Sequence, residues 1–91
     1  MLLILERGGD IATLVRGVAG GSRVVLIPAT FDPLAMAQAR AAIGPLAIEL
    51  APAVRVNAVV APEGADPADV EAAVTFLENA PSTTGQLLEL G

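Results

Sequence analysis

Apolar residues occur along the chain in four short runs, and each run predicts a β-strand. The second run is a continuous stretch of β-branched and aliphatic residues, which is typical of a strand covered on both faces. The third run places Arg55 and Asn57 on one side and valines and alanines on the other, because side chains alternate along a strand. The four predicted strands are Leu2–Leu5, Val24–Ile27, Val54–Ala61 and Gln86–Leu90.

The segments between these runs predict three helices. Asp10 is a good N-cap for the first, because its carboxylate can accept hydrogen bonds from free N–H groups of the first turn. Gly20-Gly21 is expected to end this helix. Apolar residues then mark one helical face at the i, i+3, i+4 and i+7 spacing, namely Ile11, Leu14, Val15 and Val18.

The second helix is predicted from about Pro33 to Ala51 and is rich in alanine. Gly44-Pro45 is expected to kink or split it, because proline removes one hydrogen bond and clashes with the preceding turn. Asp66-Pro67 predicts the start of the third helix, a cap followed by proline at the first position. Its buried stripe is expected to contain Val70, Ala73, Val74 and Leu77.

A βαβαβαβ alternation with short connections predicts a single α/β domain over residues 1–91. We expect three helices and a four-stranded, mainly parallel sheet with its strands in sequential order. The usual handedness of crossovers would place all three helices on one face of that sheet.

The composition predicts a protein that associates with another chain. Hydrophobic residues make up 54% and charged residues 16%, while Phe31 and Phe76 are the two aromatics. A small aliphatic core cannot hide so much apolar surface, which favours burial between subunits. The net charge of −5 and five scattered arginines provide no cationic stripe, so we expect no nucleic-acid partner and no binding to anionic membranes.

The residue types also restrict the possible chemistry. Without cysteine or histidine, only carboxylates remain as metal ligands, and no metal site is predicted. The start, MLLILERGGD, has no basic region or cleavage site and is interpreted as a strand. No segment approaches the roughly 20 apolar residues of a membrane span. The cytoplasm is therefore the expected compartment.

Ligands of parallel sheets bind outside the carboxyl ends of the strands, an edge that would present Arg7, Thr30, Asp32 and Glu63. Asp32 and Glu63 could form a pair of carboxylates, with Arg7 as an anion anchor. The simpler interpretation, which we favour, makes Asp32 a helix N-cap and Glu63 a solvated turn residue. For Arg55 and Asn57 we likewise favour hydrogen bonds to neighbouring loops over a position in a ligand-binding site.

Two segments resemble short-chain dehydrogenases/reductases. LAIELAPAVRVNAVVAP (46–62) is similar to the end of the sixth helix and the sixth strand of that family, and PADVEAAVTFLENAPSTTGQLLELG (67–91) to its last helix and strand. The resemblance implies a shortened, degenerate relative that corresponds to the C-terminal half of the Rossmann-like domain. It also implies a left-handed crossover that moves the last helix to the other face of the sheet.

The resemblance implies a dimer through the helix Ala35–Ala51, since the family's corresponding helix packs against its twin. The candidate interface residues are Ala35, Ala39, Ala42, Ile43 and Leu46. The alternative surface is the edge strand Leu2–Leu5, whose unpaired backbone groups could pair with a second copy.

The catalytic residues of the family have no counterparts in this chain, which contains neither tyrosine nor lysine. The family's Tyr-x-x-x-Lys falls on Asp32 and Met36, and its serine falls on Ala29 or Thr30. Pro62 is followed by Glu63 instead of glycine, and no glycine-rich dinucleotide loop is present. We therefore predict no catalytic or cofactor-binding residues, no NAD or NADP cofactor and no enzyme activity.

Three hypotheses follow from the sequence. The leading one is a non-catalytic short-chain-dehydrogenase-like module that forms a homo-oligomer or binds a complete relative as a hetero-oligomer. The alternative is a small ligand-binding protein or enzyme that uses carboxylates at the strand ends. The third is a decayed remnant that folds without a selected role.

Overall fold

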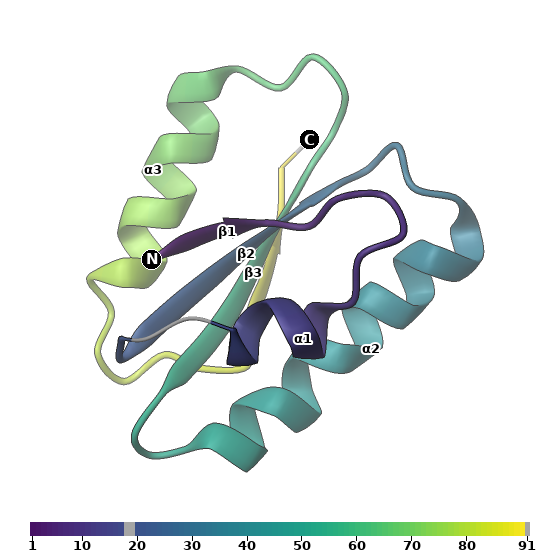
Figure 1. The fold of residues 1–91 in the computed structure, drawn as a ribbon. Helices are drawn as coiled ribbons and strands as arrows, with labels where there is room; N and C mark the ends of the chain where they lie inside the picture. The colour runs from purple at the N-terminus through teal and green to yellow at the C-terminus, as the bar shows by residue number, and fades with distance from the viewer. Residues whose placement is uncertain (18–19, 91) are drawn as a thin grey trace.

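The computed structural model describes residues 1–17 and 20–90, and within them strands and helices alternate strictly along the chain (Figure 1). This confirms the predicted α/β class. In chain order the elements are β1 (Leu2–Ile4), α1 (Ile11–Arg16), β2 (Ser22–Pro28), α2 (Pro33–Leu50), β3 (Arg55–Ala61), α3 (Pro67–Glu78) and β4 (Leu87–Glu89).

The four strands of the described residues form one sheet in the order β1-β2-β3-β4, and all three pairings are parallel. The two central strands pair along their whole length, from Ser22 opposite Arg55 to Pro28 opposite Ala61. Both have the nearly continuous apolar sequence that a doubly covered parallel strand requires. β1 and β4 are three-residue strands at the two edges.

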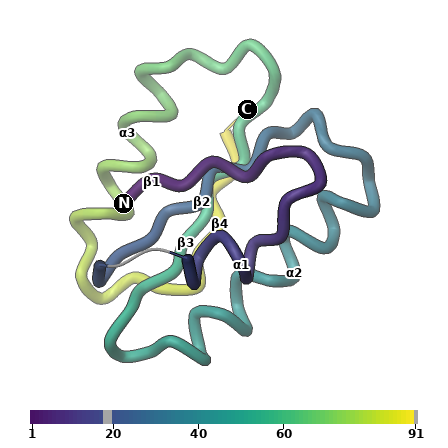
Figure 2. Tube along the Cα trace, viewed as in Figure 1, coloured from purple at the N-terminus to yellow at the C-terminus, as the bar shows by residue number. Residues whose placement is uncertain are grey.

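The helices cover the two faces of the sheet unequally (Figures 1 and 2). Side chains of α1 and α2 share the larger core cluster with strand residues such as Val25 and Val56, whereas α3 packs through Ala73 and Leu77 on Val24 and Val59. Each strand is added on the same side of the one before it, so all three crossovers run in the same direction across the sheet. The crossover through α3 passes over the other face and therefore has the opposite hand to the crossovers through α1 and α2. Of the two arrangements considered from the sequence, the structure has the one implied by the family resemblance, with α3 on the other face of the sheet from α1 and α2.

The first helix is shorter than its apolar pattern predicted. Asp10 caps it as expected, accepting from the Thr13 N–H at 3.0 Å and the Thr13 hydroxyl at 2.9 Å, and these bonds lower the pKa of Asp10. The helix ends at Arg16, with Gly17 as its C-cap, and not at Gly20-Gly21. Glycine at position 17 favours this earlier end because it is a poor helix former. Val18 lies outside the described residues.

Pro45 does not split the second helix, which runs unbroken through it. The proline and Ala41, whose carbonyl would otherwise accept its N–H, both lie on the exposed side. Water can therefore satisfy the unpaired carbonyl. Ile43, Leu46 and Ala47 are buried on either side of the proline, and their packing holds the two halves of the helix to the same sheet.

Among the described residues, no helix combines the length and the hydropathy that are needed to cross a membrane.

Arg55 at the start of β3 holds the C-terminal end of α3. Its guanidinium donates to the carbonyls of Leu77 at 3.0 Å, Glu78 at 3.0 Å and Ala80 at 2.7 Å. The last carbonyls of a helix lack partners within the helix and carry partial negative charge, so a cation is favourable there. This confirms that Arg55 bonds a neighbouring loop.

Asn57, two residues further along β3, holds the segment that leads into β4. Its side chain is fully buried, donates to the Thr83 carbonyl at 3.0 Å and accepts from the Gln86 N–H at 3.0 Å. Both backbone groups lie on a loop that has no regular secondary structure to satisfy them. The predicted structural role of Asn57 is confirmed, and its amide substitutes for a strand partner at this point.

We expect Asn57→Ala to lower the free energy of unfolding by about 2–4 kcal/mol, because it removes a fully buried amide, leaves the Gln86 N–H without that acceptor and leaves the Thr83 carbonyl with only the longer bond from Arg55 at 3.4 Å. Urea unfolding followed by far-ultraviolet circular dichroism measures this in a protein without tryptophan or tyrosine. The control is Asn79→Ala at an exposed asparagine, which should cost less than about 0.5 kcal/mol. Equal stability of the two variants would contradict the role assigned to Asn57.

Candidate functional site

The carboxyl ends of the strands carry the four residues that the sequence suggested as a ligand edge, and all four side chains are exposed. The structure divides them between two hollows. Arg7, Thr30 and Asp32 line a hollow of about 450 Å³ on the side of α2. Thr30 and Glu63 line a larger groove of about 510 Å³ on the side of α3. Asp32 and Glu63 thus face different hollows and do not form the suggested carboxylate pair.

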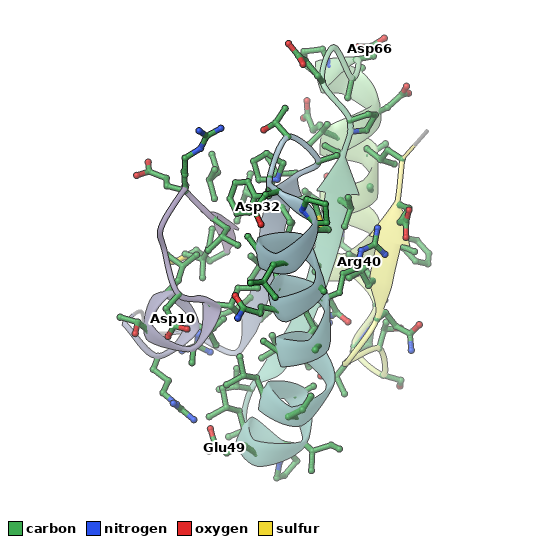
Figure 3. The ribbon with its side chains drawn as sticks, turned by 90° about the vertical axis from the view of Figure 1, so that its right-hand side faces the viewer. Asp10, Asp32, Arg40, Glu49 and Asp66 are labelled. Atoms are coloured by element: carbon green, nitrogen blue, oxygen red, sulfur yellow. The ribbon has the colours of Figure 1, made fainter. Side chains whose placement is uncertain are left out.

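Asp32 acts as the N-cap of α2. Its carboxylate accepts from the Ala35 N–H at 2.8 Å, and Pro33 occupies the first turn, where its missing N–H costs nothing. Figure 3 shows Asp10, Asp32 and Asp66 each at the start of its own helix. The simpler interpretation of Asp32 as a helix cap is therefore confirmed.

Glu63 lies in a tight turn between β3 and α3. The Ala65 N–H donates to the Pro62 carbonyl at 3.1 Å, and Gly64 has a φ of 78°, a conformation that favours glycine. The turn leaves the Glu63 side chain exposed at the mouth of the larger groove. No group of three or more side chains that could hold a metal ion occurs within the described residues.

The larger groove has mostly apolar walls, and most of its lining was not predicted. Its walls come from β1, from the ends of β2 and β3, from the turn after β3 and from α3, and β1 is far from α3 in the sequence. Only the placement of α3 on the second face brings them together, so no local pattern could have indicated this groove. The lining includes Leu2, Leu26, Pro28, Val70, Val74 and Glu71.

The interface predicted on α2 needs a correction. Ala39, Ile43 and Leu46 are only 5%, 2% and 6% exposed, because they pack on the sheet of their own chain. The structure therefore leaves these three side chains no surface for a partner. Ala35 and Ala42 are partly buried at the borders of the same face.

The opposite side of α2 presents an apolar stripe to solvent. Leu34 and Ile48 are 69% and 80% exposed, and the residues between them on that side are also apolar. We call this surface the outer stripe of α2, and it consists of Leu34, Ala37, Ala41, Pro45 and Ile48. The sequence could not separate the two sides, because apolar residues surround the whole helix.

Two ion pairs hold α2 to its neighbours on either side (Figure 3). Arg40 pairs with Glu89 of β4, and its hydrogen bond holds the pKa of Glu89 below the ordinary value of 4.5. Glu49 pairs with Arg16 at the end of α1. All four side chains are at least one third exposed, so these pairs orient α2 more than they stabilise it.

If Asp32 serves only as a helix cap, Asp32→Ala should lower the free energy of unfolding by about 1 kcal/mol, whereas Asp32→Asn should leave it nearly unchanged. The asparagine oxygen still accepts from the Ala35 N–H, and only the charge is lost. Urea unfolding of the two variants measures the difference. A large loss in the asparagine variant would show instead that the negative charge itself is needed.

Comparison with known proteins adds one match. The family model described as "Short chain dehydrogenase-like protein" matches residues 9–90 and so covers all the elements after β1. No match was found among the curated proteins or among the solved structures.

Proposed function

The chain belongs to the short-chain dehydrogenase-like proteins, and from this premise we propose that it is a non-catalytic module that associates with a second copy through the outer stripe of α2. The observation that carries the proposal is that α2 is apolar on both sides while the core of the chain covers only one of them. A helix that is hydrophobic all round is normally buried all round.

The spacing of the outer stripe supports a twofold contact. Leu34 and Ile48 lie seven residues before and after Ala41. If two α2 helices cross antiparallel at Ala41, Leu34 of each copy meets Ile48 of the other. Such a self-complementary patch suits the isologous interface of a twofold dimer, and a small residue at the crossing lets the helices approach closely.

Burial of the exposed side chains supplies the driving force. Complete burial of a leucine or isoleucine is worth about 1.5–3 kcal/mol, and the dimer would bury four such side chains in part. The ion pairs of Arg40 and Glu49 flank the stripe and would lie at the rim of the interface.

A catalytically complete relative with a matching helix is the alternative partner on the same surface.

The absence of catalytic side chains supports the non-catalytic part of the proposal. The chain contains no tyrosine and no lysine, the residues that carry proton transfer in the family it resembles. The aligned positions hold Asp32, whose carboxylate caps α2, and Met36, which carries no charge. Neither side chain can replace the tyrosine that acts as acid and base in that family, or the lysine that lowers the pKa of that tyrosine.

We predict a dimer in light scattering at micromolar concentration and a monomer for Ala41→Arg. The substitution would place two arginines against each other at the crossing point of the helices. The control is Ala72→Arg, the same change at an exposed position of α3, which should remain dimeric. A monomeric wild type, or equal masses for the two variants, would contradict the proposed interface.

We also predict no hydride transfer between NAD or NADP and alcohols or ketones, because the proton-transfer groups are absent. Absorbance at the nicotinamide band, followed in the presence of simple secondary alcohols and ketones, tests this. The reference is an identically prepared fraction from cells without the gene. Turnover clearly above that reference would remove the non-catalytic part of the proposal and leave the dimer to be judged separately.

A further inference from the structure

The second face of the sheet is only partly covered. Leu2 and Ile4 alternate with the buried Leu3 and Leu5, so they point to the face that carries α3. Their exposures are 43% and 54%, because α3 packs on residues of the central strands and approaches β1 only where the chain begins. A parallel sheet normally has helices on both faces, which identifies this as an unfilled position in the helical layer.

The shape of the gap follows from the way β1 and α3 separate. They meet at one end, where the Met1 amino group donates to Glu78 at 2.6 Å, and diverge toward the other end (Figures 1 and 2). The groove of about 510 Å³ opens between them toward the carboxyl ends of the strands. Its walls are Leu2 of β1, Leu26 and Pro28 of β2, and Val70 and Val74 of α3.

The charges at the groove are all negative. Glu63 and Glu71 are among its lining residues, and no arginine is. Neither carboxylate has an ion pair or a hydrogen-bond donor among the described residues. Glu78 at the closed end is already engaged: burial would raise its pKa, but bonds from the Met1 amino group and the Ser22 hydroxyl outweigh burial and hold it below 4.5. Two carboxylates are therefore available to a cationic partner.

We propose that this groove binds an amphipathic helix of a partner protein, with its apolar stripe on Leu2, Ile4 and Val74 and a basic residue beside Glu63 or Glu71. The helix would lie next to α3 at the usual interaxial distance of about 8–10 Å and extend the helical layer over β1. A small molecule could fill the groove itself but would leave Ile4, beyond its walls, exposed.

The length of α3 limits the size of the partner helix. Twelve residues at about 1.5 Å each make a wall of about 18 Å, so three to four turns of helix suffice. The outer stripe of α2 lies on the other side of the sheet. Occupation of the groove is therefore compatible with the proposed dimer, and either idea can fail without the other.

The test uses a designed peptide of about 14 residues with a leucine stripe, flanking lysines and one tryptophan. Because the protein has neither tryptophan nor tyrosine, the fluorescence and anisotropy of the peptide report binding directly. We expect saturable binding with a blue shift, and binding at least about tenfold weaker for the same peptide with glutamate in place of lysine. Salt should weaken the lysine peptide.

Variants locate the binding. Leu2→Lys removes part of the apolar wall and adds a repelling charge, so we expect at least about tenfold weaker binding, and about threefold or more for Glu71→Gln. The control is Ala72→Lys on α3, which lies outside the groove lining and should bind as wild type. Circular dichroism checks that each variant is folded.

Four results would overturn the proposal. The first is the absence of saturable peptide binding, and the second is equal binding by Leu2→Lys, Glu71→Gln and wild type. The third is loss of self-association in Leu2→Lys without peptide binding, which would assign the groove to a second copy. The fourth is saturable binding of hexylamine without binding of the peptide, which would identify a small-molecule site. The dimer variant Ala41→Arg should bind the peptide normally, which separates this test from that of the proposed function.

Discussion

The hydrogen bonds that join Arg55 and Asn57 of β3 to the last turn of α3 and to the loop before β4 are the constraint on which the rest of this structure depends. They hold the C-terminal end of α3 and the strand that follows it against β3. A crossover of the hand opposite to its neighbours is disfavoured, and this one has only a short edge strand to pair with. Arg55 and Asn57 satisfy the irregular backbone of this segment with hydrogen bonds. These bonds add the stability that the short pairing of β4 with β3 does not provide.

Placing α3 on the second face has consequences for the whole surface. One face receives two helices and most of the core, while the other receives one helix and a small cluster. On the first face, α1 and α2 cover the strands, and exposed apolar side chains such as Leu34 and Ile48 lie on the side of α2 that points away from the sheet. The second face remains open over β1. The outer stripe of α2 and the groove beside β1 therefore have different origins and lie on opposite sides of the sheet.

The three aspartates that precede the helices are engaged by the backbone of their own helices. Each helix begins with an aspartate whose carboxylate accepts from the backbone of its own first turn, namely Asp10, Asp32 and Asp66. A carboxylate used in this way satisfies N–H groups that would otherwise lack a partner. At the strand ends, Glu63 lies exposed beside the apolar groove, while Arg7 and Asp32 line the separate hollow on the side of α2.

The sequence by itself determined the order and type of the elements, the three helix caps and the loop-bonding role of Arg55 and Asn57. These depend on local periodicity, on residues with restricted backbone angles and on polar groups that must be satisfied when buried. Only the tertiary structure decided which side of α2 packs on the sheet and which residues line the groove. Apolar residues surround α2, so periodicity cannot orient it. Leu2 and Val74 line one groove only because the hand of the crossover through α3 brings them to the same face of the sheet.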